Sequence, residues 1–370
     1  MAWRDTFIRY FGAGLLGGIT VGDWGKRLRD NHFAIAPSCL PRAMAITLQS
    51  LQNSVFGWYE NWRYGSKLND VAVQPPLFLL GHWRHGTTHL HNLLTVDERF
   101  AFANNYQVLF PHSFLATEAS ASRLMAFFTP KRRPMDNVEW NLQSPQEDEF
   151  ALCIASGKSP YMGWVFPRRQ EHYDRYLTFR GVSPAEVACW REAFLLFLKK
   201  LTWKYGRPLV LKSPPHTCRI RLLLEMFPHA RFVHIQRNPY AVFPSSRWTF
   251  QVNYELHRLQ STRSDQLDEW VLRQYRTMYE VFFEERKLIP QGKLVEVRFE
   301  QLEADPLCQL RHVYSVLGLP DFGLAEPAIR RYIDSIAGYQ KNKFPELSPV
   351  LRKRIADEWR RCFEEWGYPV

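Results

Sequence analysis

Short apolar runs alternate with helical patterns in the part of the chain that follows residue 76. Four of these runs predict strands, at residues 77–80, 209–211, 231–235 and 293–297. Apolar positions spaced three or four residues apart predict helices, at residues 183–205, 218–227, 240–250, 265–288 and 348–366. Strands that alternate with helices are typical of a parallel sheet joined by right-handed crossovers. The pattern therefore predicts an α/β fold in which helices flank a central parallel sheet.

The first 72 residues follow a helical pattern without strands. They include a long amphipathic segment at residues 43–64, and two consecutive prolines, Pro75 and Pro76, separate the region from the first strand. We therefore expect an N-terminal helical extension over residues 1–72 and a second unit over residues 73–370. Within that unit, residues 110–176 are rich in proline, aromatic residues and charge, and they predict an irregular segment.

A glycine-bounded turn follows the first predicted strand and leads into a helix. Gly81 and Gly86 enclose this turn, and Thr87 and Thr88 follow it. A strand–turn–helix of this kind directs backbone N–H groups and the positive end of a helix at one point, which favours binding of a phosphate. The spacing is nearly that of the P-loop, but Thr87 stands where the P-loop has lysine. The nearest cation is Arg84, so the turn predicts an anion site that does not hold ATP or GTP.

Two later strands end in cations. Lys212 and Ser213 follow the strand at residues 209–211, and Arg237 follows the strand at residues 231–235. In open α/β sheets, ligands bind at the carboxyl ends of the strands. The helix after Arg237 carries Ser245. We therefore expect these side chains at the same edge of the sheet as the glycine-bounded turn. Arg247 is a weaker candidate for the same site.

Together these motifs resemble sulfotransferases that use 3′-phosphoadenosine 5′-phosphosulfate (PAPS), and most of all the bacterial-type group related to tyrosylprotein sulfotransferases. The resemblance runs from about residue 77 to the C-terminus and implies a P-loop-like three-layer fold for the catalytic domain, residues 73–370. It implies that the 5′-phosphosulfate binds the segment Arg84-His85-Gly86-Thr87-Thr88, and that the 3′-phosphate binds Arg237 and Ser245. It also implies that Lys212 lies near the transferring sulfuryl group, with Ser213 holding this lysine in the resting complex.

The general base is the point at which the chain departs from the tyrosylprotein enzymes. Their glutamate lies about two dozen residues after the loop, where this chain has Ala103-Asn104-Asn105-Tyr106. A carboxylate can take the proton of an acceptor hydroxyl, and Glu147, followed by Asp148 and Glu149, is our candidate. The same residue completes a Ser-x-x-Glu pattern with Ser144, which is typical of a capping box. Both interpretations of Glu147 remain open at this stage.

Two further groups of residues have alternative interpretations. Lys341 and Lys343 lie in a basic, aromatic segment that would close the nucleotide site by analogy with related enzymes, or would be a solvated run of charge. His85 and His89 are four residues apart, as two helical metal ligands would be, but we expect His85 in the loop and therefore no metal site. His216 has no assigned role.

Composition narrows the choice of partners and compartment. The chain has 370 residues and a net charge of +11, which suits a multiply anionic donor. The basic residues are dispersed and no nucleic-acid recognition motif is present, so we expect no nucleic-acid partner. Six scattered cysteines indicate thiols in a reducing compartment, and hence a cytoplasmic protein. The apolar run at residues 11–19 is too short to span a bilayer; together with Trp3 and Phe7 it either lies on a membrane surface or packs on the catalytic domain.

The sequence therefore predicts in-line transfer of a sulfuryl group from PAPS to a hydroxyl. The aromatic-rich segments at residues 1–70 and 106–176 favour a lipid or other hydrophobic alcohol as acceptor, with a carbohydrate or a peptide as the alternatives. A P-loop-type kinase is the second hypothesis for function, and a non-catalytic, membrane-associated nucleotide-binding protein is the third. The oligomeric state is not predicted.

Overall fold

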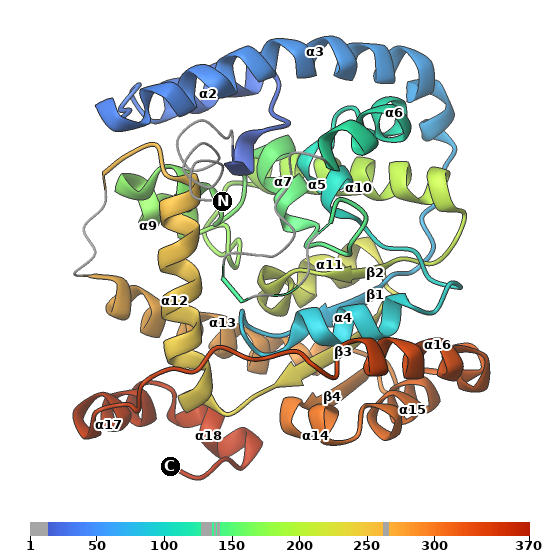
Figure 1. Ribbon diagram of the computed structural model, residues 1–370, viewed down its shortest axis with the longest axis vertical. Coiled ribbons are helices and arrows are strands. Elements are labelled where there is room, and N and C mark those ends of the chain that lie inside the picture. Colours follow the sequence, from blue (N-terminus) through green and yellow to red (C-terminus); the bar gives the residue numbers. More distant parts are fainter. Residues whose placement is uncertain (1–13, 127–134, 137, 139–140, 262–265) are drawn as a thin grey trace.

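The computed structural model describes residues 14–126, 135–136, 138, 141–261 and 266–370 (Figure 1). Its sheet has four parallel strands in the order β2-β1-β3-β4. The strands are β1 (Leu77–Leu80), β2 (Val210–Lys212), β3 (Arg231–Gln236) and β4 (Leu294–Arg298). Leu77 pairs with Val210 on one side and with Arg231 on the other. All four predicted strands and the α/β class are confirmed.

Alternate side chains of β1 enter two different apolar layers, because successive residues of a strand point to opposite faces. Phe78 and Leu80 belong to the larger buried cluster, and Leu77 and Leu79 belong to the smaller one. The smaller cluster includes apolar residues of helices α4 and α15, and the larger one includes residues of α10, α12 and α13. The sheet is thus the middle of three layers.

Helices lie before the sheet, in the connections between its strands and after its last strand. Those before β2 are α2 (Val21–Asp30), α3 (Leu40–Asn69), α4 (Thr87–Thr95), α5 (Asn105–Leu109), α6 (Phe114–Ala126), α7 (Glu149–Ser156), α8 (Met162–Val165), α9 (Gln170–Asp174) and α10 (Pro184–Tyr205). Those after β2 are α11 (Ile220–Met226), α12 (Pro239–His257), α13 (Leu267–Glu285), α14 (Phe299–Ala304), α15 (Pro306–Leu317), α16 (Phe322–Ser335), α17 (Pro349–Glu358) and α18 (Arg360–Trp366). Short 3₁₀ turns occur at Gly14–Leu16, Pro37–Cys39, Pro167–Arg169, Pro214–Cys218 and Arg286–Leu288.

Several helix boundaries follow from their local sequence. The Ser183 hydroxyl accepts a hydrogen bond from the N–H of Glu186, and Pro184 occupies the first turn, so α10 begins where the sequence predicts. The single helix expected at residues 348–366 is wrong, because the chain forms α17 and α18 with a break at Trp359. In the described part of residues 110–176 the chain forms the four α-helices α6, α7, α8 and α9, which the irregular composition did not predict.

The N-terminal region packs against the rest of the molecule through part of its apolar run. Leu15, Leu16 and Ile19 are almost fully buried and belong to the same cluster as residues of α12. Packing is therefore the interpretation that holds for these residues, whereas Trp3 and Phe7 lie outside the described residues. The boundary between residues 72 and 73 stays a prediction. Among the described helices, none has the length and apolar character needed to cross a bilayer.

Candidate functional site

The turn after β1 adopts backbone angles that favour glycine. Gly81 and Gly86 have φ values of 147° and 91°, and Arg84 between them has a φ of 72°. A Cβ on Gly86 would lie 2.2 Å from the ring of Phe299, which is the first residue of α14. Only a glycine fits there, because both the backbone angle and the neighbouring ring exclude a side chain. The turn thereby brings the start of α4 close to the end of β4.

This turn lies at the topological switch point of the sheet. The connection from β1 leads to β2 on one side, and β3 then pairs with the other side of β1. In doubly wound sheets with this order, ligands bind outside the carboxyl ends of the two strands at the switch. Gly81 follows β1 and Arg237 follows β3, so both lie at this place. The order of the strands thus explains why residues far apart in sequence share one site.

Three of the predicted donor-binding side chains are in contact. The Arg84 Nε donates a hydrogen bond to the Ser245 hydroxyl at 2.8 Å. The Arg237 guanidinium donates to the backbone carbonyl of Arg84, also at 2.8 Å. Burial and the neighbouring charge of Arg84 lower the pKa of Arg237 below its usual value. Two cations held this close favour an anion between them.

A carboxylate of the chain itself already contacts this cluster. Arg84 forms an ion pair with Asp136 at 2.6 Å, and the Asp136 side chain is buried. The C-terminal segment after α16 covers the same place, because the Tyr339 hydroxyl donates to the Asp136 carbonyl and the Asn342 amide donates to the Met135 carbonyl. Asp136 therefore occupies a position at which an anionic ligand would meet Arg84.

The ring of Phe299 contacts Arg237 and one further cation, Lys341. The guanidinium carbon of Arg237 lies 4.2 Å from the ring centre, and the Lys341 Nζ lies 5.6 Å from it. Lys341 also pairs with Glu303 at 2.6 Å. Arg237 and Lys341 thus both contact the ring of Phe299, and Lys341, like Lys343, is exposed. Arg247 lies at the surface and pairs with Asp268, so it is not gathered with them.

A second group of polar side chains lies at the carboxyl end of β2. The Lys212 ammonium group donates to the Glu147 carboxylate at 2.8 Å, and the Lys212 side chain is almost fully buried. The Tyr161 hydroxyl donates to the other oxygen of Glu147, and the Trp83 indole N–H donates to Tyr161 at 3.1 Å. Burial, and then the charge of Glu147, raise the pKa of Tyr161 well above its usual value. Tyr161 is therefore a neutral donor that fixes the orientation of Glu147.

The capping-box interpretation of Glu147 is wrong. Helix α7 begins at Glu149 with Asp148 as its N-cap residue, and no side chain caps it. The Glu147 carboxylate instead contacts Lys212 and Tyr161. Its side chain is 12% exposed, in contrast to the next two carboxylates, which are fully buried. Of the three acidic residues, Glu147 is thus the one that a substrate can reach.

Asp148 and Glu149 hold the start of α7 against the segment that follows β2. Asp148 contacts His216 at 2.6 Å and accepts a hydrogen bond from Ser213 at 3.0 Å, while Glu149 forms a two-point ion pair with Arg219. Burial alone would raise the pKa of Asp148, but His216 and the hydrogen bonds lower it below its usual value. Ser213 also accepts a bond from the N–H of Glu149. These contacts fix Glu147, the residue before them, opposite Lys212.

Residues 75–323, about two thirds of the chain, match the model of the sulfotransferase family. The chain belongs to this family. It is 36% identical over 367 residues to the omega-hydroxy-beta-dihydromenaquinone-9 sulfotransferases of Mycobacterium bovis and Mycobacterium tuberculosis, covering 99% of this chain and 93% of each relative. Family membership implies PAPS as the donor, and it excludes the kinase and the non-catalytic hypotheses.

Two solved structures share the fold of this sulfotransferase. STF9 from Mycobacterium avium superposes with a TM-score of 0.71, at 17% identity, over 92% of this chain and 89% of that chain. STF1 from Mycobacterium tuberculosis superposes with a TM-score of 0.61, at 17% identity, over 92% of this chain and 91% of that one. These similarities support the three-layer arrangement described above.

His85 of the sulfotransferase loop is packed inside the protein. His85 lies in the loop, as expected, where it is buried, stacks on Tyr279 and contacts the Ile235 carbonyl at 3.1 Å. Burial holds the pKa of His85 well below its usual value, so the ring is neutral. Within the described ranges, no three His, Cys, Asp or Glu residues form a group that could hold a metal ion.

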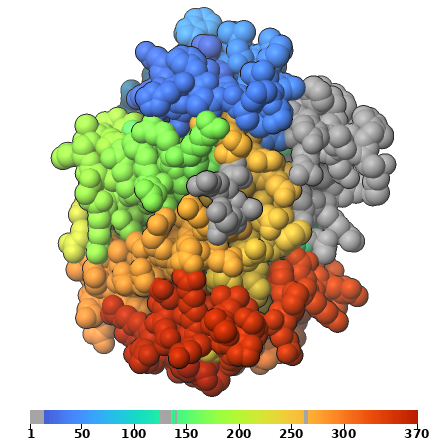
Figure 2. All heavy atoms as spheres, turned by 90° about the vertical axis from the view of Figure 1, so that its left-hand side faces the viewer, coloured from blue at the N-terminus to red at the C-terminus, as the bar shows by residue number. Residues whose placement is uncertain are grey.

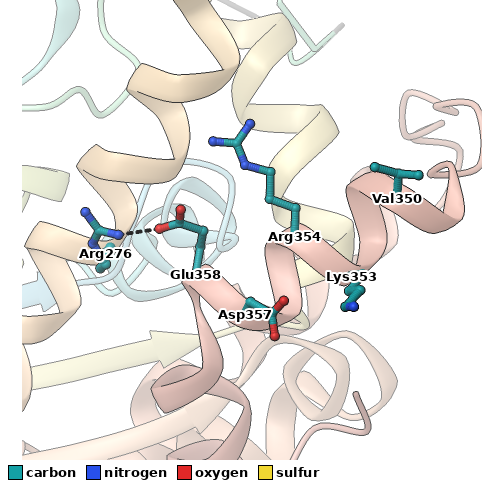
Figure 3. Close-up of a pocket in the computed structure, with 6 residues that line it drawn as sticks. All are labelled: Arg276, Val350, Lys353, Arg354, Asp357 and Glu358. Carbon is teal, nitrogen blue, oxygen red and sulfur yellow. Dashed lines mark hydrogen bonds and ion pairs between the residues drawn. The ribbon is translucent and has the colours of Figure 1, made fainter.

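A surface pocket lies away from this site. Its volume is about 560 Å³, and it lies between α13 and α17 (Figure 3). Charged side chains line it, including Arg276, which pairs with Glu358 across it. It includes none of the residues that the sequence singled out, so we assign it no part in sulfuryl transfer.

Sequence reasoning missed Asp136, Tyr161 and Phe299. No sequence motif marks Tyr161 or Phe299, because their contacts join segments that are far apart in sequence. Phe299 directly follows a strand, so its place at the carboxyl edge was the one available signal. Asp136 lies in a segment whose composition indicated only irregular structure.

Proposed function

We propose that this sulfotransferase transfers the sulfuryl group of PAPS to the hydroxyl of a lipid or other hydrophobic alcohol, and that Glu147 is the base. The proposal is carried by one observation: a reachable carboxylate, Glu147, faces a buried lysine, Lys212, at the sheet edge that also holds Arg84, Arg237 and Ser245. This edge therefore combines a base, a cation for the leaving group and an anion clamp.

The donor would bind across the switch point. Arg84 and the N–H groups at the start of α4, with the Thr87 and Thr88 hydroxyls, suit the 5′-phosphosulfate, because a helix start and a guanidinium both favour a dense negative charge. Arg237 and Ser245 suit the 3′-phosphate, and Lys341 lies close enough to join them. In this proposal Arg84 exchanges Asp136 for the donor.

Transfer then requires a proton acceptor and a cation at the leaving oxygen. Glu147 takes the proton of the acceptor hydroxyl while that oxygen forms a bond to sulfur. The bond from sulfur to the 5′-phosphate oxygen breaks, and 3′,5′-adenosine diphosphate leaves. Lys212 is released from Glu147 as the carboxylate becomes neutral, and its charge then stabilises the leaving phosphate. We assign Ser213 and His85 to the support of this arrangement, and no metal takes part in it.

Two findings support a hydrophobic acceptor. The related mycobacterial enzymes are named for a hydroxylated menaquinone, which is a lipid alcohol. In this chain, the aromatic rings of Trp83, Phe150 and Trp164 surround Tyr161, which holds the base. Rings beside the reactive carboxylate favour an apolar acceptor over a carbohydrate.

The test uses the full-length protein, labelled PAPS and two acceptors in detergent: a prenylated quinone with a terminal hydroxyl, and a free sugar of similar concentration. We expect label to move to the hydroxylated lipid and not to the sugar, with release of 3′,5′-adenosine diphosphate. Calorimetry with 3′,5′-adenosine diphosphate tests the donor site separately. Absence of binding heat in folded protein would refute the donor site, and transfer to the sugar alone would refute the acceptor class.

A further inference from the structure

Helix α3 (Leu40–Asn69) has its apolar and polar faces reversed. Ordinary surface helices bury their apolar stripe and expose their polar face. In α3, seven large apolar side chains are between 51% and 71% exposed, namely Leu40, Met44, Leu48, Leu51, Val55, Trp58 and Trp62. They are spaced by three or four residues and so lie within about 80° of arc at 3.6 residues per turn. They form one stripe, which we call the outer stripe.

Polar contacts fix the opposite face of α3 to the molecule. The Asn53 amide donates to the carbonyls of Gly17 and Ile19, and Glu60 is buried and pairs with Lys200 at 2.6 Å. The indole N–H of Trp24 in α2 donates to Thr47. These bonds prevent the helix from rotating to bury the outer stripe. Its exposure is therefore built into the fold.

The outer stripe lies at one end of the molecule. Figures 1 and 2 show α2 and α3 along this end, with the C-terminal helices α17 and α18 at the other. In Figure 1, none of the described elements lies on the outer side of α3. A helix of 30 residues is about 45 Å long, so the stripe is a long, narrow apolar surface.

We propose that the outer stripe docks on the surface of an anionic lipid bilayer. Charge favours this occupant over a second copy of the chain. Glu60 is the only carboxylate in α3 and it is buried, whereas Arg63 and Lys67 are exposed. On α2, two cations, Lys26 and Arg29, are exposed beside one exposed carboxylate, Asp30. Opposite charges beside the seam favour a helix pair, but a second copy of α3 offers no exposed carboxylate within that helix to Arg63 and Lys67. Anionic headgroups complement these cations.

The aromatic residues of α3 point to the same occupant. Trp58 and Trp62 are the most exposed members of the outer stripe, and Tyr59 stands beside them with its ring 6.0 Å from that of Trp62. Tryptophan and tyrosine prefer the boundary between hydrocarbon and water. Docking would place the enzyme at the membrane, where a lipid alcohol is found. This access to the acceptor is the one part of the inference that rests on the proposed function. Vesicle binding itself needs neither donor nor acceptor.

The test measures co-sedimentation of the full-length protein with vesicles of phosphatidylcholine containing about one third phosphatidylglycerol. The α3 variant carries Met44→Gln, Leu48→Gln, Val55→Gln and Trp62→Gln. The matched control carries Leu288→Gln, Val316→Gln, Leu324→Gln and Val350→Gln, which also replace four exposed apolar side chains. We expect the α3 variant to bind at least ten-fold more weakly than the wild type, and the control to bind like the wild type. Both variants should keep the wild-type melting temperature.

A second pair of variants tests the role of charge. Leu48→Glu with Val55→Glu should bind more weakly than Leu48→Lys with Val55→Lys, because only the first pair repels anionic headgroups. Equal binding by the wild type and the α3 variant would overturn the proposal. So would a dimer in buffer that the α3 variant loses, which would assign the outer stripe to a second copy. If the full-length protein does not bind vesicles and binding appears only after deletion of residues 1–13, the occupant of the outer stripe is that segment and not a bilayer.

Discussion

The carboxyl edge of the sheet and the outer stripe of α3 depart from normal burial in opposite directions. At the sheet edge, charged side chains such as Lys212 and Arg219 are inside the protein. On α3, apolar side chains such as Leu48 and Trp58 are outside. Burying a charge requires a partner, and exposing an apolar stripe gives up the stabilisation of burial. Each region therefore indicates a ligand: an anion and a proton donor in the first, an apolar surface in the second.

The sheet edge and the outer stripe also differ in whether other residues of the chain provide contact partners for their side chains. Every buried charge discussed above at the sheet edge has a partner within the chain, and Asp136 even provides a carboxylate for Arg84. Asn53 and Glu60 of α3 make polar contacts with the rest of the molecule, but they lie on the face opposite the outer stripe. The buried charges of the candidate site are thus paired within the chain, whereas none of the described residues covers the outer stripe of α3.

The largest effect should come from Glu147, the residue on which the catalytic half of this comparison depends. Glu147→Gln removes the proton acceptor but keeps the size of the side chain. We expect kcat to fall by about 10²–10⁴-fold, while calorimetry shows that 3′,5′-adenosine diphosphate still binds. Glu284→Gln is the matched control, because Glu284 is also ion-paired but lies at the surface. Wild-type turnover by Glu147→Gln would exclude Glu147 as the base.

A smaller effect is expected when Arg237, which lies in the candidate donor site, is compared with Arg247, which lies at the surface. Arg237→Ala removes the cation that contacts the Arg84 carbonyl and the Phe299 ring. The donor product should therefore bind about 10–100-fold more weakly, as expected for charged hydrogen bonds. Arg247→Ala is the control, since Arg247 pairs with Asp268 at the surface. Titration calorimetry gives both dissociation constants. Equal losses in the two variants would contradict the clamp.

The smallest effect concerns pH. Burial, with the nearby charge of Lys212, lowers the pKa of His91 to about 3, whereas an unfolded histidine has a pKa of about 6.5. The native state then binds fewer protons than the unfolded state between these values, so stability is fully present above pH 6.5 and falls as pH decreases toward 3. One such histidine lowers the free energy of unfolding by about 1.4 kcal/mol for each unit by which pH falls in this window.

Urea unfolding at pH 7, 6 and 5 measures this slope. His91→Gln should reduce it by that amount, whereas His312→Gln, an exposed change on α15, should leave it unchanged. An unchanged slope in His91→Gln would mean that His91 is protonated in the folded protein. No comparable dependence is expected from the outer stripe, since its seven side chains do not ionise.

The sequence was sufficient for the elements whose signals are local. The four strands, the glycine-bounded turn and the start of α10 could be predicted because each depends on neighbouring residues. The break between α17 and α18 could not, since Trp359 at the break is fixed by stacking on Tyr275 at 3.8 Å, a contact with a distant helix. The inner and outer faces of α3 could not be assigned either, because its amphipathic pattern indicates an apolar stripe without saying whether that stripe is covered.

The same limit applies to the site. The positions of Arg84, Lys212 and Arg237 followed from their strands, but the pairing of Lys212 with Glu147 needed the fold, because 65 residues separate them. The choice between base and helix cap for Glu147 was undecided in the sequence and depended on where α7 begins. The roles of the individual residues in sulfuryl transfer stay predictions until the variants are measured.

The connection between β1 and β2 has a consequence for how such an enzyme can diversify. Glu147, Phe150, Tyr161 and Trp164 belong to the part of this connection that follows α4. The proposed donor-binding residues lie outside that stretch: Arg84, Thr87 and Thr88 precede it, and Arg237, Ser245 and Phe299 follow it. Exchange of the first stretch for one of different shape would leave the adenosine side of the fold in place. One scaffold can therefore acquire new acceptors by insertion and drift within a single crossover, without rebuilding the part that recognises the common donor.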